Sequence, residues 1–378
     1  MERIVTQTHR LCLTVIAGLL AGLPLSAAAQ TLAASSDHSL FARTGTVWSV
    51  GANDSGQLGD GTVVGQNTPV PVSGPTNAIA VSAGLTHSLA LTSAGDVWAW
   101  GANDFGQLGN NGQNDTPDCS VVCRRTPDQL GLTSVVAIAA GYWHSVALRQ
   151  NGDVYTWGMN MKGQLGTGAA GSPVLVPTLV TSGAIGIAAG ANHTVVLKAD
   201  GSVWSAGAND RGQLGDGTNT QRDAFVAMSG VASVVQVAAG MSHSLMLLND
   251  GTLKAVGNNS FASLGDGTFA HRTLPVAVSG LTNVVSVRGG NSHSVALRSD
   301  GSMWAWGFNV GGILGIGTTL NQRVPAPVLA LPASVEIATG WFHHFALTTG
   351  GITWAWGRNV EGQLGDGTTT GRTIAAPQ

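Results

Sequence analysis

The chain has 378 residues, only 10% of them charged, and its formal net charge is −3. Basic residues are therefore outnumbered by acidic ones, which argues against nucleic-acid binding, because such binding relies on basic residues to neutralise phosphates. Glycine supplies 54 residues and hydrophobic residues supply 43% of the chain. Such a composition argues against disorder and favours a β-rich fold with many tight turns.

The first 29 residues are typical of a secretory signal peptide. A basic start containing Arg3 and Arg10 precedes an apolar stretch over residues 11–23, and alanines occupy residues 27–29, as before a cleavage site. The sequence predicts a signal peptide over 1–29 and a mature chain over 30–378. An uncleaved anchor is the alternative, although the apolar stretch is short for a membrane span. We expect export to the periplasm or the extracellular space of a bacterium, with no stable membrane insertion after cleavage.

The mature chain consists of seven copies of one segment. A histidine marks the same position in each copy, at intervals of 49, 57, 49, 50, 50 and 50 residues. These histidines are His38, His87, His144, His193, His243, His293 and His343. The copies run roughly over residues 30–77, 78–134, 135–183, 184–233, 234–283, 284–333 and 334–378, which leaves no room for a second domain.

Each copy predicts four short strands in a fixed order. A small apolar strand, as at residues 235–240, leads to a strand that starts at the histidine, as at 87–91. An Asp-Gly or Asn-Gly turn follows, and then an alternating aromatic strand, as at 97–101. After a glycine-rich turn, a strand with prolines such as 69–72 suits a sheet edge. Four strands per copy predict an all-β fold, a seven-bladed β-propeller with antiparallel blades.

The repeat resembles that of the regulator of chromosome condensation family. Its consensus is Ala-Ala-Gly-x-x-His-Ser-x-Ala-Leu, followed by Asp-Gly-x-Val-Trp-Ala-Trp-Gly-x-Asn-x-x-Gly-Gln-Leu-Gly-Asp-Gly-Thr. The resemblance covers the whole mature chain and implies a seven-bladed propeller. With its signal peptide, the chain is similar to the secreted bacterial propeller-type β-lactamase inhibitor protein, which covers its target with loop aromatics. The family's best-known member, a guanine-nucleotide exchange factor for a small GTPase, implies an alternative function.

The repeated residues are interpreted as structural. A catalytic histidine needs a unique set of partners, which seven equivalent histidines cannot all have. We expect each imidazole to satisfy backbone groups where its blade turns, the alternative being a ring of metal-binding histidines. Tryptophans two residues apart, such as Trp98 and Trp100, share a sheet face and predict packing between blades. No polar cluster breaks the pattern, so we expect no enzyme, cofactor or metal, with an exported hydrolase as a further alternative.

The positions at which the copies differ are the candidate recognition residues. The two residues before the histidine vary, and they are large aromatics at Tyr142-Trp143 and Trp341-Phe342. We expect these four side chains on one face of the disc, either as anchors of a partner or as packing residues over the central shaft. The partner would be an unknown protein or, as a second candidate, a glycan. We expect the protein itself to be a monomer.

An insertion accounts for the longer interval of 57 residues. It spans residues 110–125 and contains Cys119, Cys123, Arg124 and Arg125. The two cysteines remain as an even pair in an exported chain, which favours a local disulfide over a reduced pair or a zinc site. A disulfide-closed loop carrying two arginines is a second candidate for partner binding, and the alternative is a surface loop with no role in binding.

Overall fold

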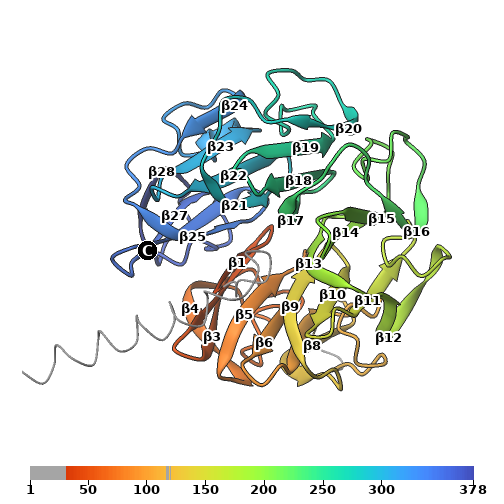
Figure 1. Ribbon diagram of the computed structural model, residues 1–378. Coiled ribbons are helices and arrows are strands. Elements are labelled where there is room, and N and C mark those ends of the chain that lie inside the picture. Colours follow the sequence, from red (N-terminus) through yellow and green to blue (C-terminus); the bar gives the residue numbers. More distant parts are fainter. Residues whose placement is uncertain (1–30, 116–118, 120) are drawn as a thin grey trace, which may run out of the picture.

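The computed structural model describes residues 31–115, 119 and 121–378, and it confirms the predicted all-β fold. Seven four-stranded antiparallel sheets stand around a central axis as the blades of a propeller (Figure 1). The predicted signal peptide lies outside the described residues. No helix in the described part of the chain is long and apolar enough to cross a membrane.

Each blade is a meander of four consecutive strands, the first nearest the axis and the fourth at the rim. Blades 1 to 3 consist of β1 (Leu32–Ala34), β2 (His38–Arg43), β3 (Thr46–Gly51), β4 (Gln66–Thr76), β5 (Ala78–Ala83), β6 (His87–Thr92), β7 (Val97–Ala102), β8 (Cys123–Gln129), β9 (Val135–Ala140), β10 (His144–Arg149), β11 (Val154–Asn160) and β12 (Gly171–Thr181). Blades 4 to 7 consist of β13 (Ala184–Ala189), β14 (His193–Lys198), β15 (Val203–Gly207), β16 (Arg222–Ala227), β17 (Val234–Ala239), β18 (His243–Leu248), β19 (Leu253–Gly257), β20 (Arg272–Ala277), β21 (Val284–Gly289), β22 (His293–Arg298), β23 (Met303–Gly307), β24 (Gln322–Pro327), β25 (Ser334–Thr339), β26 (His343–Thr348), β27 (Thr353–Gly357) and β28 (Arg372–Pro377). A 3-10 turn, η3 (Val310–Gly312), follows β23. The predicted repeat boundaries fall in the connections between blades.

The hydrophobic core lies between neighbouring blades. Trp100 of blade 2 is fully buried against Leu40 and Val72 of blade 1. Its indole Nε1 donates to the carbonyl oxygen of Gln57 at 2.8 Å, so the polar atom of the ring is also satisfied. Gly59 faces this ring, where a Cβ atom would lie 2.7 Å from Nε1, and its φ is +70°. The glycine of the Gly-Gln-Leu-Gly turn therefore makes room for the tryptophan of the next blade.

The seven repeated histidines are also buried between blades. His38 Nε2 lies 2.9 Å from the hydroxyl of Ser88 in the next blade, and that hydroxyl donates to the carbonyl oxygen of Gln57 at 2.8 Å. Because the hydroxyl hydrogen goes to the carbonyl, the imidazole is the donor to Ser88. We expected the imidazoles to bond backbone groups. The contact is instead with a side-chain hydroxyl of the neighbouring blade, because the histidine lies at a blade interface rather than at a free turn.

The ring closes without a blade that mixes strands from both ends of the chain. Blade 1 is β1 to β4 and blade 7 is β25 to β28. The carboxylate of Glu336 accepts hydrogen bonds from the backbone N–H groups of Thr31 at 2.7 Å and Leu32 at 3.0 Å. Phe41 and Phe345 pack edge to face at 5.1 Å. Side-chain packing and hydrogen bonds thus join the first and last blades.

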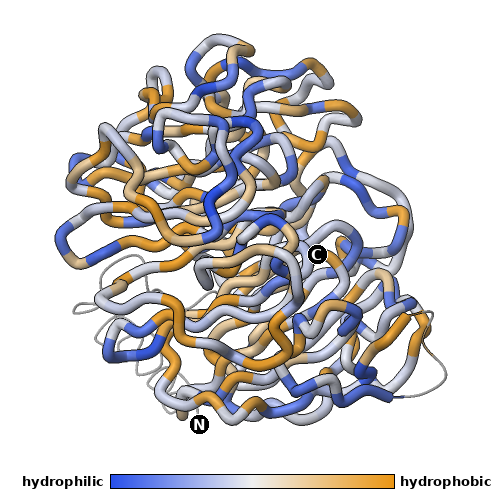
Figure 2. Tube along the Cα trace, turned by 90° about the vertical axis from the view of Figure 1, so that its right-hand side faces the viewer, coloured by the Kyte–Doolittle hydropathy of each residue, from blue (hydrophilic) through white to orange (hydrophobic). Residues whose placement is uncertain are grey.

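The meander places equivalent connections at the same end of the disc. The connections between first and second strands and between third and fourth strands lie at one end, which we call the loop face. The hairpin turns between second and third strands lie at the opposite end. Along the chain, polar and apolar stretches alternate throughout the described residues (Figure 2), as expected where every strand contributes to an interface between blades.

Candidate interaction face

A continuous belt of aromatic rings crosses the loop face. Each ring contacts the next, and the belt passes through blades 2, 3, 7, 6 and 5 in that order. In this order the aromatic belt consists of Phe105, Trp143, Tyr142, Trp341, Phe342, Phe308 and Phe261. Tyr142 and Trp143 lie in the connection between β9 and β10, and Trp341 and Phe342 lie in the equivalent connection between β25 and β26. The four aromatics expected from the sequence therefore share one face and one contact network.

The centre of the belt lies over the mouth of the channel along the propeller axis. Tyr142 and Trp341 come from blades 3 and 7, and their ring centroids are 4.4 Å apart with an interplanar angle of 32°. Both residues line a central cavity of about 170 Å³, whose wall otherwise consists mainly of alanine, glycine and aliphatic residues of the inner strands. The two rings therefore cover one end of the shaft.

Tyr142 is buried, which fits the second of the two roles expected for it, packing over the central shaft. It is only 9% exposed, and its ring contacts both Trp143 and Trp341. Burial raises the pKa of its phenol well above the usual value. The hydroxyl makes no hydrogen bond within the described residues. Tyr142 thus takes the packing role over the shaft, while Trp143, Trp341 and Phe342 stay partly exposed.

Exposed apolar side chains also lie on the loop face. Met161 in blade 3, Val310 in blade 6 and Val360 in blade 7 are 58%, 62% and 60% exposed. All three lie in connections between third and fourth strands, and hence on the loop face. The loop face therefore carries exposed apolar side chains besides the aromatic belt.

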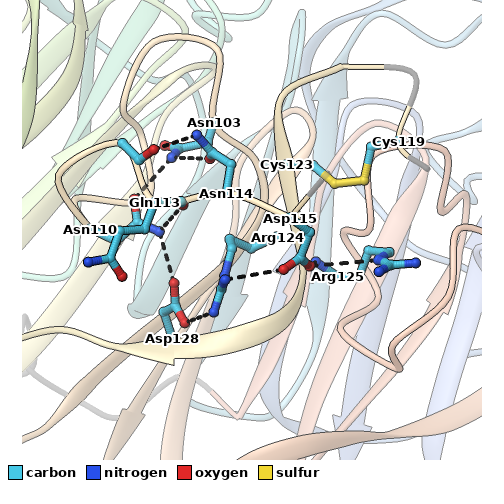
Figure 3. A network of polar contacts seen from close by, with 11 residues as sticks. Asn103, Asn110, Gln113, Asn114, Asp115, Cys119, Cys123, Arg124, Arg125 and Asp128 are labelled. Carbon is cyan, nitrogen blue, oxygen red and sulfur yellow. Dashed lines mark hydrogen bonds and ion pairs between the residues drawn. A yellow bond between two sulfur atoms is a disulfide. The ribbon is translucent and has the colours of Figure 1, made fainter. Parts of the chain in front are cut away.

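The insertion of blade 2 lies at the rim of the same face. It connects β7 to β8, and the backbone N–H of Asn103 donates to the carbonyl oxygen of Val122 at 2.7 Å, which brings the insertion beside the loop that carries Phe105. The Cα atoms of Cys119 and Cys123 are 6.2 Å apart, and the two sulfur atoms are joined (Figure 3). That separation is normal for a disulfide. The oxidation state of the pair in the native protein stays a prediction.

Arg124 and Arg125 make ion pairs within the chain. Arg124 contacts Asp128 and lies 3.1 Å from Asp115, whose carboxylate also accepts the backbone N–H of Arg125 at 2.8 Å (Figure 3). The Arg125 guanidinium lies 3.7 Å from the same carboxylate. Both side chains are largely covered. The structure thus gives the two arginines a role in holding the insertion on the blade, and their contact with a partner stays a prediction.

The described residues contain no group of three or more His, Cys, Asp or Glu side chains placed to hold a metal ion. Six of the seven repeated histidines contact hydroxyl groups between blades, at distances such as 3.0 Å from His87 Nε2 to the Ser145 hydroxyl. Burial lowers the pKa of His87 to about 3, so its imidazole is neutral at physiological pH. A neutral, enclosed donor of this kind serves packing rather than acid–base chemistry.

A family model for the RCC1-like domain matches residues 20–231 and 184–378. The chain belongs to the RCC1-like domain family. Among curated relatives it is similar to human E3 ubiquitin-protein ligase HERC2, with 32% identity over 158 residues, which is 41% of this chain and 3% of HERC2. It is also similar to the ultraviolet-B receptor UVR8 of Arabidopsis thaliana, with 32% identity over 37% of this chain and 32% of the receptor. The mouse regulator of chromosome condensation is 34% identical over 33% of this chain and 30% of its own length.

Solved structures share the fold of this RCC1-like chain over most of its length. Human WBSCR16 superposes with a TM-score of 0.73 and 27% identity, covering 82% of this chain and 85% of WBSCR16. Yeast RCC1 (Prp20), solved bound to Kap60, superposes with a TM-score of 0.79 and 22% identity, covering 93% and 85% of the two chains. At that identity, the likeness to yeast RCC1 shows the fold alone.

Three members of the belt were not expected from the sequence. Phe105, Phe261 and Phe308 lie in the glycine-rich turns between third and fourth strands, which we interpreted only as repeated turn elements. Phe105 and Phe261 occupy a turn position where other copies have residues such as Ser55 or Arg211. Phe308 directly precedes the repeated asparagine, where blade 1 has Ala52. The turns and the connections before the histidines meet only because both lie on the loop face.

Proposed function

We propose that this RCC1-like propeller is an exported, non-catalytic binding protein whose loop face covers a protein partner. The observation that carries the proposal is the aromatic belt, which crosses five blades and the mouth of the shaft without a break. Aromatic clusters with partly exposed rings are the usual centres of protein interfaces. Exposed Met161, Val310 and Val360 favour a protein over a glycan, because aliphatic side chains add apolar contact area but no stacking surface for sugar rings.

Export rests on the predicted signal peptide over residues 1–29, which is independent of the belt. Yeast RCC1, which shares this fold, was solved bound to another protein, Kap60. A partner of this chain is not inferred from that complex. A partner that binds this face would present a surface with exposed apolar side chains.

Affinity capture from the exported fraction tests the proposal. The bait is mature wild-type protein, compared with the double variant Trp143→Ala/Phe342→Ala, which removes two partly exposed rings of the belt. The matched control is Ile352→Ala, because Ile352 is an exposed apolar residue in the hairpin turn at the opposite end of the disc. We expect the control to retain the captured partner and the double variant to bind it at least about tenfold more weakly.

Other outcomes separate the remaining functions. Equal binding by the double variant and the wild type would show that the belt is not the interface. Loss of capture after deglycosylation of the fraction would identify a glycan as the ligand. If the mature protein accelerated nucleotide release from a small GTPase, the function would be nucleotide exchange rather than non-catalytic binding.

A further inference from the structure

The junction between blades 6 and 7 lacks hydrogen bonds that the other junctions share. At each of the other six, the histidine Nε2 lies near a serine or threonine hydroxyl of the next blade. At the same six, a backbone N–H of the turn before the fourth strand donates to a carbonyl oxygen of the next blade's outer segment, as from Gly267 to Arg323 at 3.0 Å. Neither contact occurs between blades 6 and 7, all of whose residues are described.

The cause of the first loss is His344, which replaces the hydroxyl residue in blade 7. His293 therefore faces an imidazole, and the two ring centroids are 4.7 Å apart. Neither ring nitrogen of His293 has a hydrogen-bond partner, and Nε2 of His344 has none. His344 instead stacks on Trp356 at 5.2 Å, and the indole Nε1 of Trp356 also lacks a partner. In contrast, Trp306 at the preceding junction donates to the Ser263 carbonyl at 2.9 Å.

The loop face of this junction is weakly joined as well. At the ring closure, Trp341 N–H donates to the Ser35 carbonyl at 2.9 Å, and similar bonds link blades 2 through 6. No such bond joins the loops of blades 6 and 7, and blades 1 and 2 also lack it although they keep the other two contacts. The opposite end does keep its contact, because the N–H of Ser334 donates to the Gly301 carbonyl at 2.9 Å. Opening would therefore start at the loop face and hinge at the opposite end.

Protonation disfavours the closed form of this junction. His293 and His344 are fully buried, and burial lowers the pKa of both imidazoles. The charged and titratable groups that act on the pair are His243 from β18 and His343 from β26, with Arg358 acting on His343. On the adjacent inner strands, Glu336 of β25 is bonded to Thr31 and Leu32 of blade 1 and interacts with Arg288 of β21. No carboxylate therefore stands ready to accept a proton from either imidazolium, so water is the better environment for the charged ring.

We propose that the propeller opens at the junction of blades 6 and 7, from the loop face, and that acid promotes this opening. The ring closure between blades 7 and 1 stays shut, because Glu336, His343 and Trp341 all bond to blade 1. Opening would separate Phe308 from Phe342, which are in contact across this junction at 6.1 Å. If the proposed function holds, a partner bound across both rings would keep the junction closed and acid would weaken its binding.

Hydrogen exchange of the free, full-length mature protein tests the proposal without any partner. Protection factors, corrected for the intrinsic effect of pH, are compared for the seven histidine strands at pH 7.5 and pH 5. We expect β22 and β26 to be at least about tenfold less protected than the equivalent strands, since each missing hydrogen bond changes an opening equilibrium several-fold. The difference should widen at pH 5. Uniform protection, or least protection at β2, would overturn the proposal.

Two variants test whether the imidazole pair causes the opening, one by removing it and one by placing it at another junction. His344→Ser restores the hydroxyl found in the other blades and should raise the protection of β22 and β26 to the level of their equivalents. Ser294→His places the same imidazole pair between blades 5 and 6, because Ser294 accepts the hydrogen bond of His243 at 3.0 Å. It should lower the protection of β18 and β22 there. If His344→Ser leaves the exchange of the junction unchanged, His344 is not the cause of the opening and the proposal is wrong.

Discussion

At the scale of single residues, the histidines show how one side chain serves seven equivalent places. Each imidazole is fully or almost fully buried, so desolvation sets its protonation state. Burial lowers the pKa of His38, His87, His144 and His243 to about 3, and that of His193 to about 4. The residues stay neutral in the folded protein throughout the physiological range and contribute as hydrogen-bond donors.

We expect the folded state to lose stability as the pH falls. Each folded pKa lies below the unfolded value of about 6.5, so the unfolded chain binds more protons below pH 6.5. The stabilisation from each neutral imidazole is complete above that pH and decreases by up to about 1.4 kcal/mol per pH unit toward pH 3. Chemical denaturation between pH 7.5 and pH 4 measures the slope. His87→Gln, which keeps a donor but cannot titrate, should make the slope shallower, and an unchanged slope would contradict the assignment.

Tyr142 provides a second test at the residue scale. Its hydroxyl is buried without a hydrogen-bond partner, while its ring contacts Trp143 edge to face and Trp341 at a tilt. Removing an unsatisfied buried hydroxyl removes a desolvation cost. Tyr142→Phe should therefore leave the free energy of unfolding unchanged or raise it by about 1 kcal/mol. Tyr142→Ala should instead lower it by about 3 kcal/mol, because the ring is lost. Thermal unfolding of the two variants makes the comparison, and equal destabilisation would show that the hydroxyl is bonded.

At the scale of elements, the insertion of blade 2 is a loop fastened by its own charges. Asp115 holds the side chain of Arg124 and the backbone of Arg125, and Asn110 Nδ2 donates to Asp128 at 2.8 Å (Figure 3). These contacts attach a longer connection to β8 without changing the blade beneath it. The sequence placed the insertion correctly from the interval between histidines, but its ion pairs depend on the course of the folded loop.

We expect Cys119 and Cys123 to be oxidised in the exported protein. Alkylation under native and denaturing conditions should label neither cysteine before reduction and both after it. Since the pair closes a very short loop, replacing both cysteines by serine should cost about 2 kcal/mol by loop-closure entropy. The cost should appear as faster proteolysis within the insertion, with the ion pairs of Asp115 keeping its base in place. Free alkylation of the native protein would show that the pair is reduced.

At the scale of the whole molecule, closure of the ring depends on contacts between the two ends of the described chain. Glu336 provides the most concentrated of them, because its carboxylate accepts from the Thr31 N–H, the Thr31 hydroxyl and the Leu32 N–H. Gln236 occupies the same position in blade 5 and accepts from Val287 N–H at 3.1 Å. The same position in the blade thus holds an amide acceptor within the ring and a carboxylate acceptor at the ring closure.

Glu336→Ala should destabilise the propeller more than Gln236→Ala. The first change leaves two backbone N–H groups and a hydroxyl without their acceptor, whereas the second leaves one N–H group. We expect a loss of about 3 kcal/mol for Glu336→Ala and about 1 kcal/mol for Gln236→Ala, measured by denaturant unfolding. Glu336→Gln keeps the acceptor and should recover much of the loss. Equal losses for the two alanine variants would mean that the closure has no special role.

The sequence by itself determined the fold, the number of blades and the place of the variable residues. Strand alternation, Asp-Gly turns and the histidine interval are local or periodic, so they are readable without knowing which blades touch. The tertiary structure alone decided that Tyr142 meets Trp341 over the shaft, that Phe105, Phe261 and Phe308 join them, and that His344 faces His293. Those contacts depend on bringing distant loops to one end of a closed ring, and spacing along the chain carries no information about distances across that ring.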